Sequence, residues 1–186
     1  MRKEKAKYLQ GKLISAIRRE DLQGVRKWLN EGASPNRSSR SLITRIVGVF
    51  WEREESPLTE AIVTGSVAIV RELLEAGANA NEDRLLVWAY AEGMVEIVDL
   101  LLSFGAKAGK RELAASVQYN RLAVAELLLG QGVDVEDSIL EYLQTHWWRK
   151  SDELLVLFEN YGFEYTDEMR SEIAERDKHL TMHDSI

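Results

Sequence analysis

The chain has 186 residues, 45% of them hydrophobic and 30% charged, which suits one globular domain or one stacked array but not two large domains. It has no cysteine, which excludes disulfides and thiolate chemistry and fits a reducing compartment, and its net charge of −7 opposes binding to nucleic-acid phosphates. No stretch approaches the roughly 20 apolar residues of a membrane span, so we expect a single cytoplasmic domain, residues 1–186.

The first predicted element, residues 8–36, introduces a pattern that returns four times. In each copy a glycine closes an apolar run, a leucine stands nineteen residues before that anchor glycine, and a small residue usually stands sixteen before it. The leucines are Leu13, Leu58, Leu86, Leu113 and Leu143, and the anchor glycines are Gly32, Gly77, Gly105, Gly132 and Gly162. Each copy is predicted to be two short helices with a tight turn between them and a left-handed glycine at the end.

The turn between the two helices falls twelve residues before each anchor. Gly65, Gly93 and Asn120 stand there in the middle copies, and they tolerate the left-handed backbone that such a turn requires. The outer copies have Glu20 and Lys150 instead. Before the first copy, the basic residues of 2–7 are expected to form a solvated end of the first helix.

Residues 37–55 form the longest connection between two copies. From the anchor glycine to the next leucine of the pattern there are 26 residues at this point, against 9, 8 and 11 at the later connections. The insert joins three arginines to an apolar group with two aromatic residues, and its candidate contact residues are Arg37, Arg40, Arg45, Phe50 and Trp51. Long loops on a rigid scaffold often bind partners, so residues 37–56 are a candidate contact surface; the same apolar residues could equally fold back and cover the first copy.

Residues 56–81 open with Ser-Pro-Leu-Thr and close their second helix with Leu-Leu-Glu-Ala-Gly-Ala. With these motifs the segment resembles the ankyrin repeat, which usually opens with Thr-Pro-Leu-His. Residues 84–108 and 111–135 keep the leucine, the small residue and the glycine ending without the proline, while residues 8–36 and 141–165 match by register alone. Tetratricopeptide repeats are the main rival, but their Trp/Tyr/Pro pattern does not align with these columns.

The resemblance implies an all-α solenoid of helix-turn-helix units. Because the ankyrin period of 33 residues leaves about 14 residues between an anchor glycine and the next leucine, three of the four β-turn fingers are shortened and the first is enlarged. It also implies that the residues fourteen and thirteen before each anchor face a concave groove. The candidates there are Arg18, Arg19, Tyr119, Trp148 and Arg149.

The adjacent residues Trp147 and Trp148 in the fifth copy allow two interpretations. They could face the groove, or they could close the last layer of the core, since terminal repeats must shield it. After this copy, residues 166–178 have an N-cap-like threonine and apolar residues at helical spacing, which predicts a final capping helix.

Motifs for phosphate loops, dinucleotide sites, zinc hydrolases and serine hydrolases are missing, and the three histidines do not form a metal pattern. We therefore expect no catalytic residue, no cofactor and no metal. The predicted function is a monomeric protein-interaction module that uses residues 37–56 and the concave face, with no nucleic acid and no membrane among its partners. The alternative is a regulatory or immunity-type inhibitor of an enzyme or of a basic nucleic-acid-binding protein, which small size and acidic charge would suit.

Overall fold

The computed structural model describes residues 2–36, 56–81, 89–90, 92–135, 152–167 and 171. The chain forms two compact units, Met1–Asp134 and Val135–Ile186, which are described separately. Every element within the described residues is a helix, which agrees with the predicted all-α class. The helices of the first unit are α1 (Arg2–Arg18), α2 (Leu22–Asn30), α4 (Pro57–Thr64), α5 (Val67–Glu75), α7 (Val95–Ser103), α8 (Lys110–Gln118) and α9 (Leu122–Gly130), and α11 (Asp152–Asn160) lies in the second.

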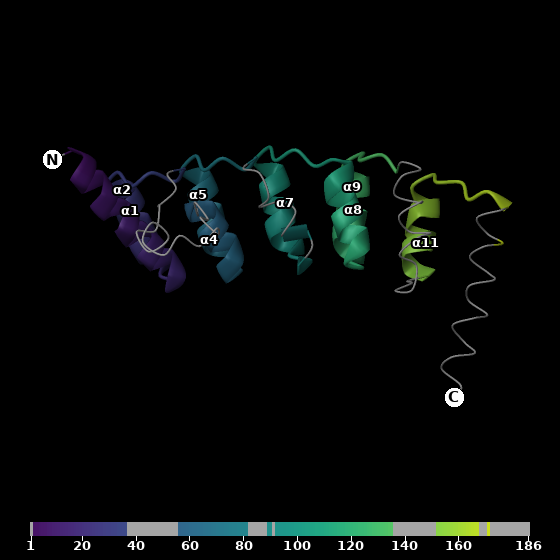
Figure 1. The fold of residues 1–186 in the computed structure, drawn as a ribbon, viewed down its shortest axis with the longest axis horizontal. Coiled ribbons are helices and arrows are strands. Elements are labelled where there is room, and N and C mark those ends of the chain that lie inside the picture. The colour runs from purple at the N-terminus through teal and green to yellow at the C-terminus, as the bar shows by residue number, and fades with distance from the viewer. Residues whose placement is uncertain are drawn as a thin grey trace, which may run out of the picture. The chain divides into compact units, whose positions relative to one another are not determined.

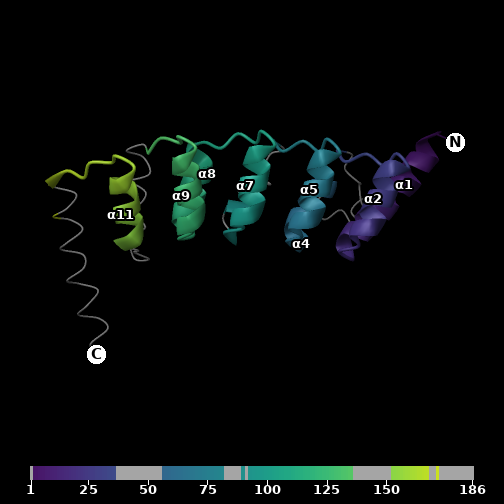
Figure 2. The same cartoon turned by 180° about the vertical axis from the view of Figure 1, so that it is seen from behind.

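The helices of the first unit form two rows. The second helices of successive copies pack in the order α2, α5, α7 and α9, and in the other row α1 packs on α4. Within a copy, α1 packs on α2, α4 on α5 and α8 on α9. The described helices of this unit follow one another in chain order, with the described residues after each second helix along one edge (Figure 1), and the view from behind shows the same order (Figure 2).

The start of the second copy shows why its helices begin where they do. The Ser56 hydroxyl accepts a hydrogen bond from the Thr59 backbone N–H at 3.1 Å, and Pro57 occupies the first helical position. A serine N-cap satisfies a backbone donor that has no partner inside the helix, and proline has no such donor to lose. The Ser-Pro that carried the family resemblance is therefore a helix-start signal.

Each described helix pair has left-handed backbone both at its internal turn and at its end. The predicted left-handed anchors are confirmed at all five glycines, whose φ angles lie between 82° and 95°. At the first of them, the N–H of Gly32 donates to the Leu29 carbonyl and that of Ala33 to the Trp28 carbonyl, both at 2.9 Å. This pair of hydrogen bonds defines a Schellman cap. This cap recurs after every described second helix and stops it at the same place in each copy.

The turn between α1 and α2 is also left-handed, although it lacks the glycine or asparagine of the middle copies. Glu20 has a φ of 54°, close to the 53° of Asn120 at the same position of the fourth copy. The hydrogen bonds of the turn, from Glu20 N–H to Ile17 and from Asp21 N–H to Ala16, are formed all the same. The geometry of the hairpin thus imposes a left-handed backbone on Glu20, although a residue with a side chain disfavours that conformation.

The core consists of the columns that the register predicts. The small residues of this column are buried, in α1, α4 and α8 and at residue 89, and they are Ala16, Ala61, Ala89 and Ser116. The leucines of the same helices are buried as well, while Leu86 and Leu143 lie outside the described residues. Trp28 differs, because it is half-buried where the next three copies have a fully buried leucine and the fifth has the fully buried Phe158.

Asparagine side chains connect successive copies at the fingers. The Asn36 side chain donates from Nδ2 to the Gly77 carbonyl at 2.7 Å, and its Oδ1 accepts from the Asn79 N–H at 2.7 Å. Asn81 makes the same pair of bonds to the third copy. An asparagine four residues after the anchor glycine therefore links the first copy to the second and the second to the third.

The second unit has one described helix, α11. Its Phe158 is fully buried, and the Tyr165 hydroxyl donates to the Leu155 carbonyl at 3.3 Å, which brings the segment after the helix back against it. Phe163 and Tyr165 meet edge to face with ring centroids 5.0 Å apart. The predicted capping helix at 166–178 lies outside the described residues, apart from residues 166, 167 and 171.

Candidate functional site

The ends of the first helices carry the side chains that were predicted to face the groove. Arg18 is the last residue of α1, Val63 lies in the last turn of α4, and Tyr119 follows the last residue of α8. Arg18 and Val63 stand two residues before the left-handed residue of their turn and Tyr119 stands one before it, so the repeated hairpin places them at adjacent positions. We call the described residues of this row, Arg18, Arg19, Val63, Thr64, Glu92, Gln118 and Tyr119, the inner row.

The inner row exposes apolar side chains. Val63 is 45% and Tyr119 is 48% exposed, although Ile62 and Val117 beside them are buried. Single exposed apolar residues are ordinary on protein surfaces. Here they occupy neighbouring positions of the inner row in two copies, fourteen residues before the anchor for Val63 and thirteen for Tyr119. A tyrosine has an apolar ring and a hydroxyl that suit it to a protein interface.

Arg18 is engaged within the protein. Its Nε lies 2.6 Å from Oε1 of Glu60, and its Nη2 lies 3.5 Å from Oε2 of the same carboxylate. The Arg18 side chain is 58% exposed and that of Glu60 12%. Arg18 therefore ties α1 to α4 while one part of its guanidinium still faces solvent, and Arg19 next to it is exposed.

A second ion pair ties the same two copies in the other row. Arg26 of α2 lies 2.7 Å from Glu72 of α5, measured from Nε to Oε2. The boundary between the first and second copies is thus bridged by charge on both rows and by Asn36 at the finger. These charges hold the copies in register.

Tyr90 is a buried polar residue that the sequence reading missed. It stands fifteen residues before its anchor, where Ile17, Ile62 and Val117 stand in the other copies, so the register alone could have singled it out. Its side chain is fully buried, and its hydroxyl has no hydrogen-bond partner within the described part of the chain. Burial, with a smaller contribution from the Glu112 carboxylate, raises the pKa of the Tyr90 hydroxyl far above its ordinary value. The phenol is closed to ligands, so it is a feature of the core and not of a site.

Seven of the ten candidate contact residues lie outside the described residues. They are Arg37, Arg40, Arg45, Phe50, Trp51, Trp148 and Arg149. Among the residues that are described, no three acidic or histidine side chains cluster closely enough to hold a metal ion. No helix in the described ranges has the length and apolar character needed to cross a membrane.

The comparisons with known proteins identify one family. A family model described as ankyrin repeats, in three copies, matches residues 13–112, just over half of the chain. The match ends inside α8, whereas the same hairpin with its two left-handed caps continues through α9 to Gly132. A comparison with curated proteins finds no match.

Proposed function

Because the chain belongs to the ankyrin-repeat family, we propose that it is a non-catalytic module that binds a protein partner. The observation that carries the proposal is the inner row, where Val63 and Tyr119 stand exposed at its two adjacent positions, at the ends of the first helices of two copies. Side chains fixed on packed helices lose little conformational freedom on binding, which favours affinity. We place the second half of the contact in the insert, residues 37–56, with its arginines and the aromatic pair Phe50 and Trp51.

The partner is expected to be neutral or basic on the surface that meets this face. The net charge of −7 repels nucleic acid and favours positively charged proteins through long-range steering. We propose that the module acts as a monomer in the cytoplasm, since a chain without cysteine loses nothing in a reducing compartment.

Capture from native lysate tests both halves of the contact. Full-length bait with Phe50→Ala and Trp51→Ala tests the insert, and bait with Val63→Ser and Tyr119→Ala tests the inner row. Each double variant is expected to weaken capture about tenfold or more, since aromatic anchors of an interface cost about 2 kcal/mol or more when truncated. Phe104→Ala is the matched control, because Phe104 is an exposed aromatic residue at the end of a second helix, away from the inner row.

Two outcomes would contradict the proposal. If neither double variant changes capture, the insert and the inner row do not bind the partner. If Phe104→Ala reduces capture equally, the effect is not specific to these two surfaces. Repeating the capture at rising salt measures the electrostatic part, because exposed charges are screened beyond about 8 Å at physiological ionic strength.

A further inference from the structure

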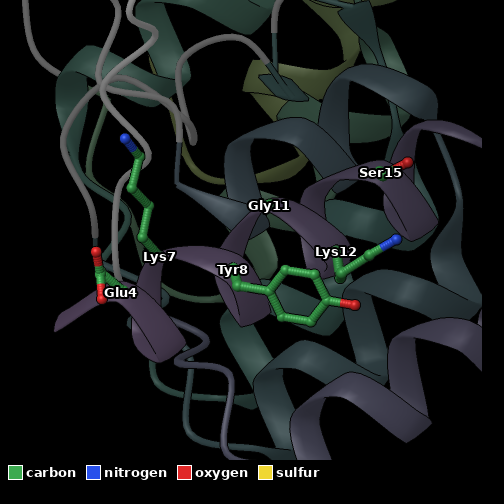
Figure 3. A pocket seen from close by; sticks show the side chains of 6 residues that line it. All are labelled: Glu4, Lys7, Tyr8, Gly11, Lys12 and Ser15. Atoms are coloured by element: carbon green, nitrogen blue, oxygen red, sulfur yellow. The ribbon is translucent and has the colours of Figure 1, made fainter. Parts of the chain in front are cut away.

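A depression on the outer face of α1 is not used by the proposed function. Its volume is about 530 Å³, and it is lined by Glu4, Lys7, Tyr8, Gly11, Lys12 and Ser15. These six residues follow one another at the three- and four-residue spacing that places side chains on one face of a helix. Figure 3 shows them along α1, with the Tyr8 ring extending towards Lys12 and with Gly11 between Glu4 and Ser15, the first and last of the six.

Gly11 forms the floor of this depression. It lies in the interior of α1, and a Cβ placed on it would meet no heavy atom of the described chain within 4 Å. Glycine inside a helix is destabilising relative to alanine, so packing does not require it here. Its effect is to leave room between Tyr8 and Ser15 for an atom of another molecule.

The aromatic side of the depression is held in place before any ligand binds. The Tyr8 ring is 58% exposed, its centroid lies 5.4 Å from the Lys12 Nζ, and it meets Trp28 edge to face at 6.3 Å. On the other side, the Lys27 Nζ lies 4.8 Å from the centre of the Trp28 ring. Two rings in edge-to-face contact, each with one lysine ammonium group over it, present an ordered, positively charged surface.

Charge identifies the partner that suits this surface. α1 contains six basic residues and one acidic residue, a net charge of +5, in a chain whose overall charge is −7. The rest of the chain thus carries −12, so α1 is a cationic end on an acidic protein. Such a local field attracts an anionic partner and repels cationic ones.

We propose that the α1 outer face, defined as Lys7, Tyr8, Gly11, Lys12 and Ser15, binds an acidic segment of a partner protein. Lys7 and Lys12 pair with carboxylates, the Ser15 hydroxyl donates to a backbone or side-chain oxygen, and a small or apolar side chain rests on Tyr8 above Gly11. This surface is separate from the inner row and binds a partner of opposite charge.

Two other anionic partners fit the face less well. A membrane-surface helix inserts its apolar side into lipid, whereas the apolar side of α1, with Leu9, Leu13 and Ile17, is buried in the core. Nucleic acid would meet the Glu4 carboxylate at the rim and the acidic remainder of the chain. A short peptide can place its carboxylates between these groups, as a uniform phosphate backbone cannot.

Fluorescence anisotropy with a defined probe tests the proposal on the full chain. The stretch from Glu4 to Ser15 is about 17 Å long at 1.5 Å per helical residue, so about six extended residues cover it. The probe is a fluorescein-labelled peptide of about that length, rich in glutamate with one central leucine. Lys7→Glu with Lys12→Glu is expected to weaken its binding at least about fivefold, since two partly exposed ion pairs are lost and reversed.

A second variant separates the shape of the site from its charge. Gly11→Gln fills the floor without changing the charge, and glutamine is a better helix former than glycine, so the fold is retained. This variant is expected to bind the peptide more weakly by a similar factor, while its melting temperature equals or exceeds that of the native chain. Lys107→Glu with Arg111→Glu makes the same charge change on exposed residues of the third and fourth copies and is the matched control. It is expected to leave affinity within about twofold because of screening. Tyr119→Ala in the inner row is also expected to leave peptide binding unchanged.

The proposal is overturned by any of four results. These are no binding of the peptide to the native chain, equal loss in the Lys107 and Arg111 control, unchanged binding in Gly11→Gln, and tighter binding to phosphatidylserine vesicles or single-stranded DNA than to the peptide. A salt-sensitive dimer in sedimentation velocity that is lost with the Lys7 and Lys12 reversal would instead assign the face to a second copy of the chain.

Discussion

Asn81 and Gly105, which belong to consecutive copies, are joined by a hydrogen bond in which the Asn81 Nδ2 donates to the Gly105 carbonyl oxygen at 3.0 Å. The Oδ1 of the same side chain accepts from the Lys107 N–H at 2.7 Å. One amide thus satisfies a donor and an acceptor of the neighbouring backbone. The contact between copies depends on this polar link as well as on the apolar core.

Asn81→Ala is expected to lower the free energy of unfolding by about 1–3 kcal/mol. Two hydrogen bonds are lost, and each contributes about 0.5–1.5 kcal/mol. Urea unfolding followed by circular dichroism measures the change. Asn30→Ala, on an exposed residue at the end of α2, is the control and should change stability by less than about 0.5 kcal/mol. Equal effects of the two variants would refute a special role for Asn81.

Gly109→Asn is expected to add the link that the third copy lacks. Gly109 stands four residues after Gly105, as Asn36 and Asn81 stand four after their own anchors, and a Cβ on it would meet Glu112 Oε2 at an ordinary 3.6 Å. The new amide can reach the fourth copy or cap α8, of which Gly109 is the N-cap, and either gain is about 1 kcal/mol. Gly109→Ala supplies the Cβ without the amide. If the alanine variant is as stable as the asparagine variant, the amide is not the cause.

Glu20→Gly is expected to stabilise the protein by about 0.5–1 kcal/mol. Glu20 has a φ of 54°, and the left-handed conformation costs a residue with a side chain about 1–2 kcal/mol, offset in part by the greater freedom of glycine in the unfolded chain. The reverse change at the same turn of the second copy, Gly65→Ala, should destabilise by about 1 kcal/mol, although the new Cβ has open space around it. Thermal melts of both variants and of the native chain measure the two changes in stability. A loss of stability in Glu20→Gly would mean that the glutamate side chain stabilises the turn.

Tyr90→Phe is expected to raise stability by about 1 kcal/mol or more near neutral pH. The Tyr90 hydroxyl is buried, and it has no hydrogen-bond partner in the described ranges, so its removal relieves an uncompensated loss of hydration. Denaturant unfolding of the two proteins measures the difference. A less stable phenylalanine variant would show that the hydroxyl has a partner.

The same residue predicts a dependence on alkaline pH. The pKa of Tyr90 is raised in the folded state above its ordinary value of 10.0, so the unfolded chain loses this proton first as pH rises. The titration of Tyr90 therefore does not lower the free energy of unfolding below pH 10.0, and it lowers that free energy progressively as pH rises above this value. Stability measured between neutral pH and pH 11 should fall more steeply in the native chain than in Tyr90→Phe. Parallel curves would contradict the raised pKa.

Arg18 and Glu60 are expected to couple by about 0.5–1 kcal/mol in a double-mutant cycle of alanine variants, because one partner is largely shielded and the other half-exposed. Unfolding of the four proteins at low and high salt measures the coupling, which should shrink with salt. A coupling near zero would mean that this ion pair does not stabilise the contact between α1 and α4.

The sequence by itself determined the repeating unit. Leucine, small residue and glycine recur at constant spacing because each copy must bury the same helix faces and end each second helix with the same left-handed cap, and both needs are local. Tertiary structure alone decided three further features. Glu20 adopts the left-handed turn because the hairpin around it requires it, and Arg18 meets Glu60 because α1 packs on α4, 42 residues away in the chain. Tyr90 takes a core position that its neighbours enclose. Glu20 depends on the packing of α1 against α2, while Arg18 and Tyr90 meet residues of other copies, so the spacing of residues along one segment does not reveal these features.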